Sequence, residues 1–239
     1  MKGRILVLVT GSSTVSTGFG TAPAGLNVFS LVEAIDPAIR AGWTIHYTSL
    51  HGSTPTCQDG CFHLLGEVDR DYYESYVEDN PNYLLPTDLA SLTEEKLQPF
   101  VGLLIPDGLG CIDDMPNHTA LKRLLQHFHH YKKPIGTLGF GIAGLLHEGY
   151  DTDWLFEGYD MTTHSDEYIA KLERWVLDDV LTFHLNDHIQ TGGGHLIYGP
   201  PAKAFLVEDR ELLTGHSAYS AAEFGRHFLK KVVHWLEHR

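Results

Sequence analysis

Short apolar runs alternate along the chain with longer segments whose apolar residues recur at helical intervals. Short apolar runs bounded by turn residues are typical of strands buried in a parallel sheet, and amphipathic segments are typical of the helices that cover such a sheet. The pattern therefore predicts an α/β fold in which helices sandwich a mostly parallel sheet, as in flavodoxin-like proteins. The predicted strands are 4–10, 43–49, 101–106, 134–138 and 204–207.

Three segments are predicted to be helices. The first lies between the first two strands, where apolar residues recur from Leu26 to Ile39, although Pro37 is expected to break or kink it. The second covers 121–128, with Asn117 as a candidate cap, and the third covers 221–237 at the end of the chain.

The segment from about 50 to 100 differs from the rest because it is acidic and rich in tyrosine. It contains Tyr72, Tyr73, Tyr76 and Tyr83, and this aromatic content is too high for a disordered linker. We expect an ordered insertion packed on a single domain that spans residues 1–239.

Composition narrows the classes of partner. The formal net charge is −14 and the pI is about 5.5, which argues against direct binding to nucleic acid or to anionic lipid. The apolar run that begins at Ile5 is too short to cross a membrane, so no membrane insertion is expected. Three cysteines in a chain of this size do not suggest a disulfide framework, and we expect a reducing, cytoplasmic location.

The segment 132–146 carries the clearest chemical signal. A short apolar strand ends at Leu138, a turn contains Gly139 and Gly141, and helical spacing follows. A residue at such a turn lies at the carboxyl edge of the sheet, beside the positive end of a helix dipole. This is where α/β folds place a nucleophile.

Three stretches resemble the ThiJ/PfpI (class 1 glutamine amidotransferase-like) superfamily. They are 132–146, which resembles the A-x-C-H-G-P-A-x-L elbow; 102–114, which resembles I-P-G-G-H-G-x-x-x-D; and 211–221, which resembles L-I-T-G-Q-N-P-A-S-A. The resemblance runs in the expected order along nearly the whole chain, and it implies the fold of that superfamily.

The chain departs from the superfamily pattern where its chemistry resides. The position of the cysteine nucleophile falls on Gly139, and the position of the following histidine falls on Phe140. The position of the activating glutamate falls on Ser30 or near Ala22, and Glu33 is expected at a helix contact or on the surface. Because thiolate chemistry requires an activated thiol, the glyoxalase, deglycase and protease-like reactions of the superfamily are not expected.

The superfamily includes members with glycine at the nucleophile position. The chain also resembles these in the runs 103–106, 124–129, 133–135 and 153–157. This resemblance implies a non-catalytic interaction or scaffold subunit, a homodimer with partners in a protein complex, cytoplasmic and peripheral to endosomes. The expected pocket residues are Gly108, Leu109, Gly110, Gly139 and Phe140.

One alternative keeps catalysis in the same pocket. An isomerase, lyase or cyclase for a small carbonyl compound could use Cys111, Ser30, His164 or Asp166. Cys111 is interpreted chiefly as a buried apolar residue, and His164 and Asp166 chiefly as surface loop residues.

No cofactor or metal site is predicted. Cys57, Cys61 and His63 offer three metal ligands, but no fourth ligand is evident.

Overall fold

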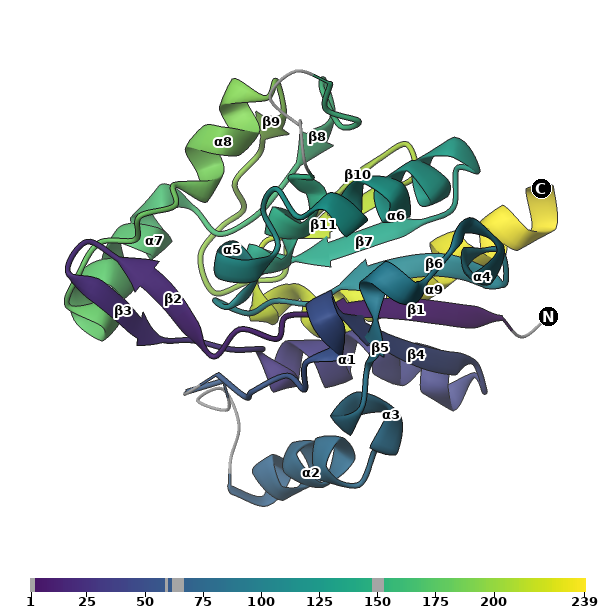
Figure 1. The fold of residues 1–239 in the computed structure, drawn as a ribbon, viewed down its shortest axis with the longest axis horizontal. Helices are drawn as coiled ribbons and strands as arrows, with labels where there is room; N and C mark the ends of the chain where they lie inside the picture. The colour runs from purple at the N-terminus through teal and green to yellow at the C-terminus, as the bar shows by residue number, and fades with distance from the viewer. Residues whose placement is uncertain (1–2, 59, 62–66, 148–152) are drawn as a thin grey trace.

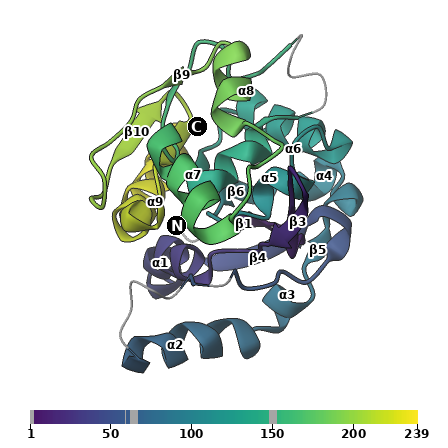
Figure 2. The ribbon, with the colours of Figure 1, turned by 90° about the vertical axis from the view of Figure 1, so that its left-hand side faces the viewer.

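The computed structural model describes residues 3–58, 60–61, 67–147 and 153–239. Its centre is a seven-stranded sheet in the order β10-β11-β7-β6-β1-β4-β5 (Figures 1 and 2). All neighbouring pairs are parallel except β10 with β11, which is antiparallel. The predicted fold class is therefore confirmed. The strands are β1 (Arg4–Val9), β4 (Thr44–Ser49), β5 (Thr87–Asp88), β6 (Phe100–Ile105), β7 (Ile135–Leu138), β10 (Leu206–Asp209) and β11 (Leu212–Gly215).

Both faces of the sheet are buried, and β1 shows why its sequence is apolar throughout. Ile5 and Val7 point into the core beneath one layer of helices, whereas Leu6 and Leu8 point into the core on the other face. Side chains alternate between the faces of a strand, so a strand covered on both sides needs apolar residues at every position. One layer contains α1 (Val28–Arg40) and α9 (Ala221–His238), and the other contains α5 (Cys111–Asp114), α6 (Thr119–His130) and the 3₁₀ helix η3 (Gly139–Leu145).

The segment 50–100 forms short elements beside α1 and at the sheet edge (Figure 2). Tyr73 packs against Phe29 of α1 and donates a hydrogen bond to the carboxylate of Glu33, so Glu33 lies at a helix contact. β5 pairs with β4, which means that part of this segment extends the central sheet. Its elements are η1 (Leu50–Gly52), α2 (Glu67–Glu78), α3 (Pro81–Leu84), β5, η2 (Leu89–Ser91) and α4 (Glu94–Leu97).

The remaining elements surround the carboxyl edge of the sheet, at the left of Figure 1. The hairpin of β2 (Thr14–Thr17) and β3 (Gly20–Pro23) lies next to α7 (Asp166–Leu172) and the π-helical turn η4 (Glu173–Leu177). A parallel pair of short strands, β8 (Asp160–Met161) and β9 (His195–Leu196), flanks α8 (Leu185–Thr191), and η5 (Ala218–Ser220) leads into α9.

Three details differ from the sequence-based expectations. α1 continues through Pro37 to Arg40. Pro37 lies in the last turn of this helix, so the backbone donor that proline lacks is lost only near the helix end. The cap of α6 is His118, whose Nδ1 accepts from the amide of Ala120, while Asn117 has a positive φ of 61° outside the helix. The strand expected at 204–207 lies at Leu206–Asp209.

The strand β11 was not among the predicted strands. It is only four residues long, yet all four are buried, and it pairs in parallel with β7. A tight turn at Arg210, with a φ of 53°, separates it from β10. Such a short run gives a weak periodic signal, and its pairing with a distant strand is what stabilises it.

Candidate functional site

The candidate site lies where the central strands end. Asp107 comes shortly after β6, Gly139 directly after β7, and His216 directly after β11. These three strands are neighbours and run in parallel, so their carboxyl ends meet at one edge of the sheet. His164 joins them from the loop between β8 and α7.

Gly139 adopts a conformation that only glycine takes readily. Its φ is +47°, and its carbonyl accepts a hydrogen bond of 2.8 Å from the hydroxyl of Thr163. A Cβ atom placed on Gly139 would lie 2.3 Å from Oδ1 of Asp107 and 2.6 Å from Nε2 of His164. Both distances are far below van der Waals contact. The space that a nucleophile side chain would need is therefore occupied by a carboxylate and an imidazole.

Asp107 and His164 form a buried pair. Each is 4% exposed, and Nε2 of His164 lies 3.3 Å from each carboxylate oxygen of Asp107. The backbone amide of Phe140 donates to Oδ1 of Asp107 at 2.9 Å. The carboxylate thus fixes both the imidazole and the first turn of η3. A carboxylate next to an imidazole can orient it and exchange a proton with it, but neither group replaces a thiolate.

Aromatic rings and a second histidine surround this pair. The ring of His164 stacks on Tyr168 at 4.2 Å between centroids and lies 4.5 Å from the ring of Phe140. Tyr168 is 44% exposed, and partial desolvation together with the nearby Asp107 charge raises its pKa to about 12. Burial also lowers the pKa of His216, whose Nε2 contacts the carbonyl of Lys203 at 2.5 Å. Tyr168 and His216 are therefore neutral near pH 7.

A cavity of about 240 Å³ lies on the outer side of Phe140. Asp166 and His184 are among its lining residues, and Nδ2 of Asn186 donates to Oδ1 of Asp166 at 2.6 Å. Of the five expected pocket residues, Phe140 lines this cavity. Gly108 and Gly110 instead lie against backbone: a Cβ on Gly108 would be 2.5 Å from the carbonyl of Gly25, and one on Gly110 would be 2.6 Å from that of Ser12.

Leu109 is also packed in the interior rather than in an open pocket. It is buried, and its backbone amide donates to the side-chain oxygen of Gln58 at 2.8 Å. The loop after β6 is thus held by close contacts on several sides.

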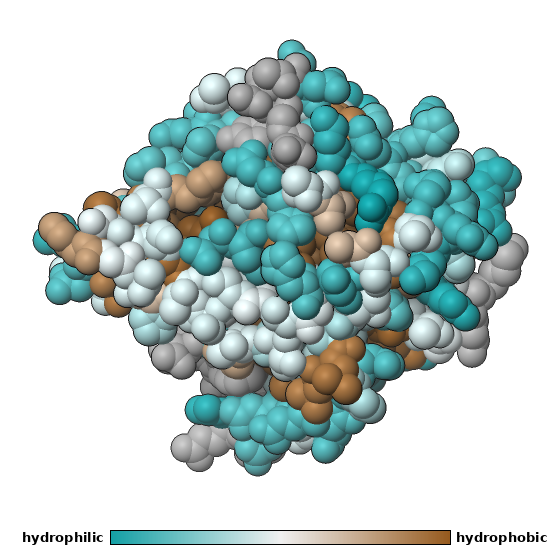
Figure 3. All heavy atoms as spheres, viewed as in Figure 1, coloured by the Kyte–Doolittle hydropathy of each residue, from teal (hydrophilic) through white to brown (hydrophobic). Residues whose placement is uncertain are grey.

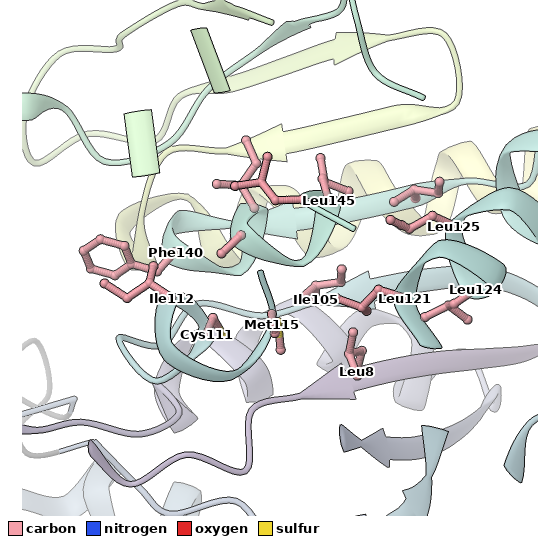
Figure 4. Close-up of a cluster of buried hydrophobic side chains, with 14 of the residues drawn as sticks. Leu8, Ile105, Cys111, Ile112, Met115, Leu121, Leu124, Leu125, Phe140 and Leu145 are labelled. Carbon is pink, nitrogen blue, oxygen red and sulfur yellow. The ribbon is translucent and has the colours of Figure 1, made fainter. Parts of the chain in front are cut away.

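The other candidate residues do not join a thiol-based site. Cys111 is fully buried beside Met115 and Ile112 (Figure 4), and burial raises the pKa of its thiol well above the ordinary value. It is therefore a neutral core residue at physiological pH. The hydroxyl of Ser30 is buried and donates to the carbonyl of Asn27 at the start of α1.

His164 corrects an expectation. It was interpreted chiefly as a surface loop residue together with Asp166, but it is buried at the centre of the site. Asp166, in the first turn of α7, lines the neighbouring cavity.

The candidate metal ligands Cys57 and Cys61 lie beside the loop after β6, where Cys57 forms an isolated bridge with Leu26. The Sγ atoms of Cys57 and Cys61 are 2.9 Å apart as free thiols, and His63 is outside the described residues. Across the described ranges, His, Cys, Asp and Glu side chains do not assemble into a group of three or more suited to a metal ion. Within the same ranges, none of the helices combines the length and apolar content that a membrane crossing requires.

Asp107 is the site residue that sequence reasoning missed. The superfamily stretch I-P-G-G places a glycine where this chain has Asp107, and that departure is visible in the sequence. Its importance depends on a second departure 32 positions later, since the Asp107 carboxylate occupies the space that Gly139 leaves empty.

Comparison with known proteins gives relatives that differ in sequence identity and in the length matched. Glutamine amidotransferase-like class 1 domain-containing protein 1 from human and cattle is 32% identical over 139 residues, which is 58% of this chain and 60% of the relative. The matched part thus spans less than two thirds of these relatives. Protein/nucleic acid deglycase HchA of Pseudomonas aeruginosa is 25% identical over 195 residues, covering 78% of this chain and 66% of the relative. No protein-family model matches the chain.

Solved structures show the fold. Glyoxalase III from Candida albicans superposes with a TM-score of 0.78 at 17% identity, covering 96% of this chain and 97% of that one. A ThiJ/PfpI domain protein from Brachyspira murdochii superposes with a TM-score of 0.59 at 13% identity, covering 98% and 99%. The predicted resemblance is therefore confirmed: the chain has the ThiJ/PfpI fold and is similar in sequence to glutamine amidotransferase-like class 1 domain-containing protein 1.

Proposed function

We propose that this protein works as a non-catalytic interaction protein that keeps the ThiJ/PfpI fold without the cysteine chemistry of its enzymatic relatives. The observation that carries the proposal is the contact of Asp107 and His164 with the position of the missing Cβ of Gly139. An enzyme that had lost only its thiol would leave a void at this point. Here a buried, hydrogen-bonded pair fills it, so the site is built around the glycine.

An exposed apolar surface supports a protein partner. Phe19, at the tip of the β2–β3 hairpin, is 96% exposed, and Trp175 and Val176 of η4 are each 72% exposed. The amide of Gly18 donates to the carbonyl of Val180, which brings the hairpin and the chain after η4 together. In Figure 3 the surface over the hairpin, at the left, is mostly of intermediate hydropathy, with apolar side chains at its margin. We call Phe19, Trp175, Val176 and Val180 the hairpin patch.

Grouped apolar side chains on a surface mark interaction sites. The occupant that we propose for the hairpin patch is a second copy of this chain, in a homodimer. A two-fold contact would place the hairpin patch of one copy on that of the other, and it would remove large rings from water.

The test of the proposal is an assay of methylglyoxal consumption, with a cysteine-dependent glyoxalase as the positive control. We expect no turnover above the protein-free reaction, because position 139 carries no thiol and burial raises the pKa of the Cys111 thiol well above its ordinary value. Turnover by the wild-type protein that is abolished in Cys111→Ser would overturn the proposal.

The buried pair also favours a second candidate function, an enzyme acting on a small carbonyl compound. Asp107 orients His164, whose ring contacts Phe140 in the wall of the cavity of about 240 Å³. An oriented imidazole can act as a general base in an isomerase, lyase or cyclase. A substrate screen would separate the two functions. Turnover that is lost in His164→Gln but kept in Cys111→Ser would support this enzyme and contradict the non-catalytic role.

A further inference from the structure

A second and larger cavity lies at the opposite edge of the sheet. Its volume is about 770 Å³. Lys132 lines it from the loop before β7, Arg210 from the turn between β10 and β11, and Lys231 and Trp235 from α9. This edge, where α9 ends, is at the right of Figure 1, away from α5 and α7. We call this cavity the basic cleft.

The basic cleft has a charge opposite to that of the whole protein. The chain has a net charge of −14, yet Lys132, Arg210, Lys231 and Arg239 are among the twelve lining residues. The single acidic lining residue is Glu211, which is buried and in contact with Nδ1 of His129 at 2.6 Å and with the hydroxyl of Tyr159 at 3.0 Å. An entering anion would therefore meet cations in the cleft wall, two of which are paired with the carboxylates of Asp209 and Glu208 outside the lining.

Two of the cations are held in place by the fold. The guanidinium of Arg210 lies 3.3 Å from the ring centroid of Tyr159 and donates to the carbonyl of Gly158 at 2.6 Å and to the carboxylate of Asp209. Nζ of Lys231 donates to Oε1 of Glu208 at 2.7 Å and to the carbonyl of Arg210. Groups fixed in this way lose little conformational entropy when a ligand binds.

Lys132 differs from these two cations. It is exposed, and its side chain has no hydrogen-bond or ion-pair partner within the described ranges. Its charge is therefore not neutralised by Glu208 or Asp209, which offset part of the charge of Lys231 and Arg210. A ligand with more than one negative charge would complete this arrangement.

Aromatic rings form part of the wall. Nε1 of Trp235 donates to the carbonyl of Tyr131 at 3.1 Å, which fixes the indole next to a tyrosine that is 43% exposed. Both residues line the basic cleft. Rings held this way can stack on a planar ligand at a small entropic cost.

We propose that the basic cleft binds a small aromatic phosphomonoester. The phosphate is a dianion near neutral pH, and it can accept from Arg210 and Lys231 while Lys132 neutralises its second charge. The planar part of the ligand stacks against Tyr131 or Trp235. This site is independent of the Gly139 region, so it does not depend on whether the protein is catalytic.

The test uses AMP as the probe and isothermal titration calorimetry as the measurement. AMP is expected to bind at least tenfold more tightly than adenosine, which lacks the phosphate, and more tightly than inorganic phosphate, which lacks the ring. Raising the salt concentration is expected to weaken AMP binding, because the charges involved are close to solvent.

Lysine variants locate the site. Lys132→Gln and Lys231→Gln are each expected to weaken AMP binding by about five- to tenfold, the effect of losing one charge-assisted contact. The matched control is Lys230→Gln, which neutralises the exposed neighbour of Lys231 on the same helix and should leave the affinity unchanged. Because the Lys132 side chain has no described partner, its replacement should not disturb folding.

Three outcomes would overturn the proposal. AMP that fails to bind at millimolar concentration contradicts it, as does AMP binding that survives the double variant K132Q/K231Q. Inorganic phosphate that binds as tightly as AMP contradicts the aromatic part and leaves a simple anion site.

Discussion

The two edges of the central sheet differ in how much space their side chains leave open. At the carboxyl edge, Asp107 and His164 are buried against Gly139, and the space used for chemistry in enzymes of this fold is closed. At the amino-terminal edge, Lys132 and Arg210 line an open cleft of about 770 Å³. Accessible cationic groups thus line the edge where the fold does not usually place its site. Function therefore cannot be inferred from the fold alone.

At the carboxyl edge, two positions in contact with each other differ from the superfamily motifs in opposite directions: one has a smaller side chain and the other a larger one. By its resemblance to the superfamily motifs, the chain is expected to have Gly139 at the position of the cysteine and Asp107 at a glycine of the I-P-G-G stretch. The carboxylate of Asp107 then fills the volume next to Gly139 and accepts the amide of Phe140. Cores tolerate paired changes that conserve volume better than single ones.

The largest expected effect comes from filling the glycine position. Gly139→Ala should lower the free energy of unfolding by about 3 kcal/mol, because the new Cβ would overlap Asp107 and His164 and the φ is positive. Urea denaturation measures the change. The matched control is Gly158→Ala, where φ is +69° but no atom lies within 4 Å of the new Cβ, so only about 1 kcal/mol should be lost. Equal losses at both sites would contradict the closed-edge description.

A double variant sharpens the same point. Gly139→Cys alone should be destabilising and should give no methylglyoxal turnover. Combining it with Asp107→Gly restores the superfamily pattern at both positions, and the double variant should be about 1–3 kcal/mol more stable than the sum of the single changes predicts. Additive effects in the double-mutant cycle would show that Asp107 does not occupy the nucleophile space.

Asp114 provides a pH-dependent test of the polar network at the carboxyl edge. Its Oδ2 accepts from the hydroxyl of Thr10 and from the amides of Gly11 and Ser12, yet burial raises its pKa from 3.8 to about 6. The folded state therefore holds this proton more strongly than the unfolded state does. The resulting stabilisation is complete below about pH 4 and is lost as the pH rises through about 6.

Asp114→Asn should remove that pH dependence. Between pH 4 and pH 7 the wild-type protein should lose about 1–2 kcal/mol of unfolding free energy relative to Asp114→Asn, as measured by urea denaturation at each pH. Glu95→Gln changes an exposed carboxylate in α4, outside this network, and serves as the control. Parallel pH profiles of the wild type and Asp114→Asn would refute the assignment.

The smallest expected effect on stability concerns the hairpin patch. Phe19→Ser should change the unfolding free energy by less than about 0.5 kcal/mol, because the side chain is 96% exposed. It should nevertheless weaken the homodimer, which sedimentation velocity over a range of concentrations would detect. Leu85→Ser is the control, since Leu85 is 81% exposed but lies outside the hairpin patch. A wild-type protein that stays monomeric at high concentration would exclude this interface.

The layered fold and the glycine at the turn after β7 can both be read from the sequence alone. β1 is apolar at every position after Arg4 because both of its faces are buried, and this pattern depends only on the local side-chain period. Gly139 was identifiable because the strand, the turn and the glycines are adjacent in the chain. Local patterns of this kind can be recognised without knowledge of the tertiary structure.

Which side chains contact Gly139, and which cations line the basic cleft, become visible only in the folded molecule. His164 meets Asp107 across 57 positions of sequence, and the basic cleft combines Lys132, Arg210 and Lys231 from three separate segments. Neither group of residues can be recognised from the spacing of residues in the sequence, because each depends on which strands become neighbours and where they end. Strand order is set by packing over the whole sheet, so these sites could be found only in the folded molecule.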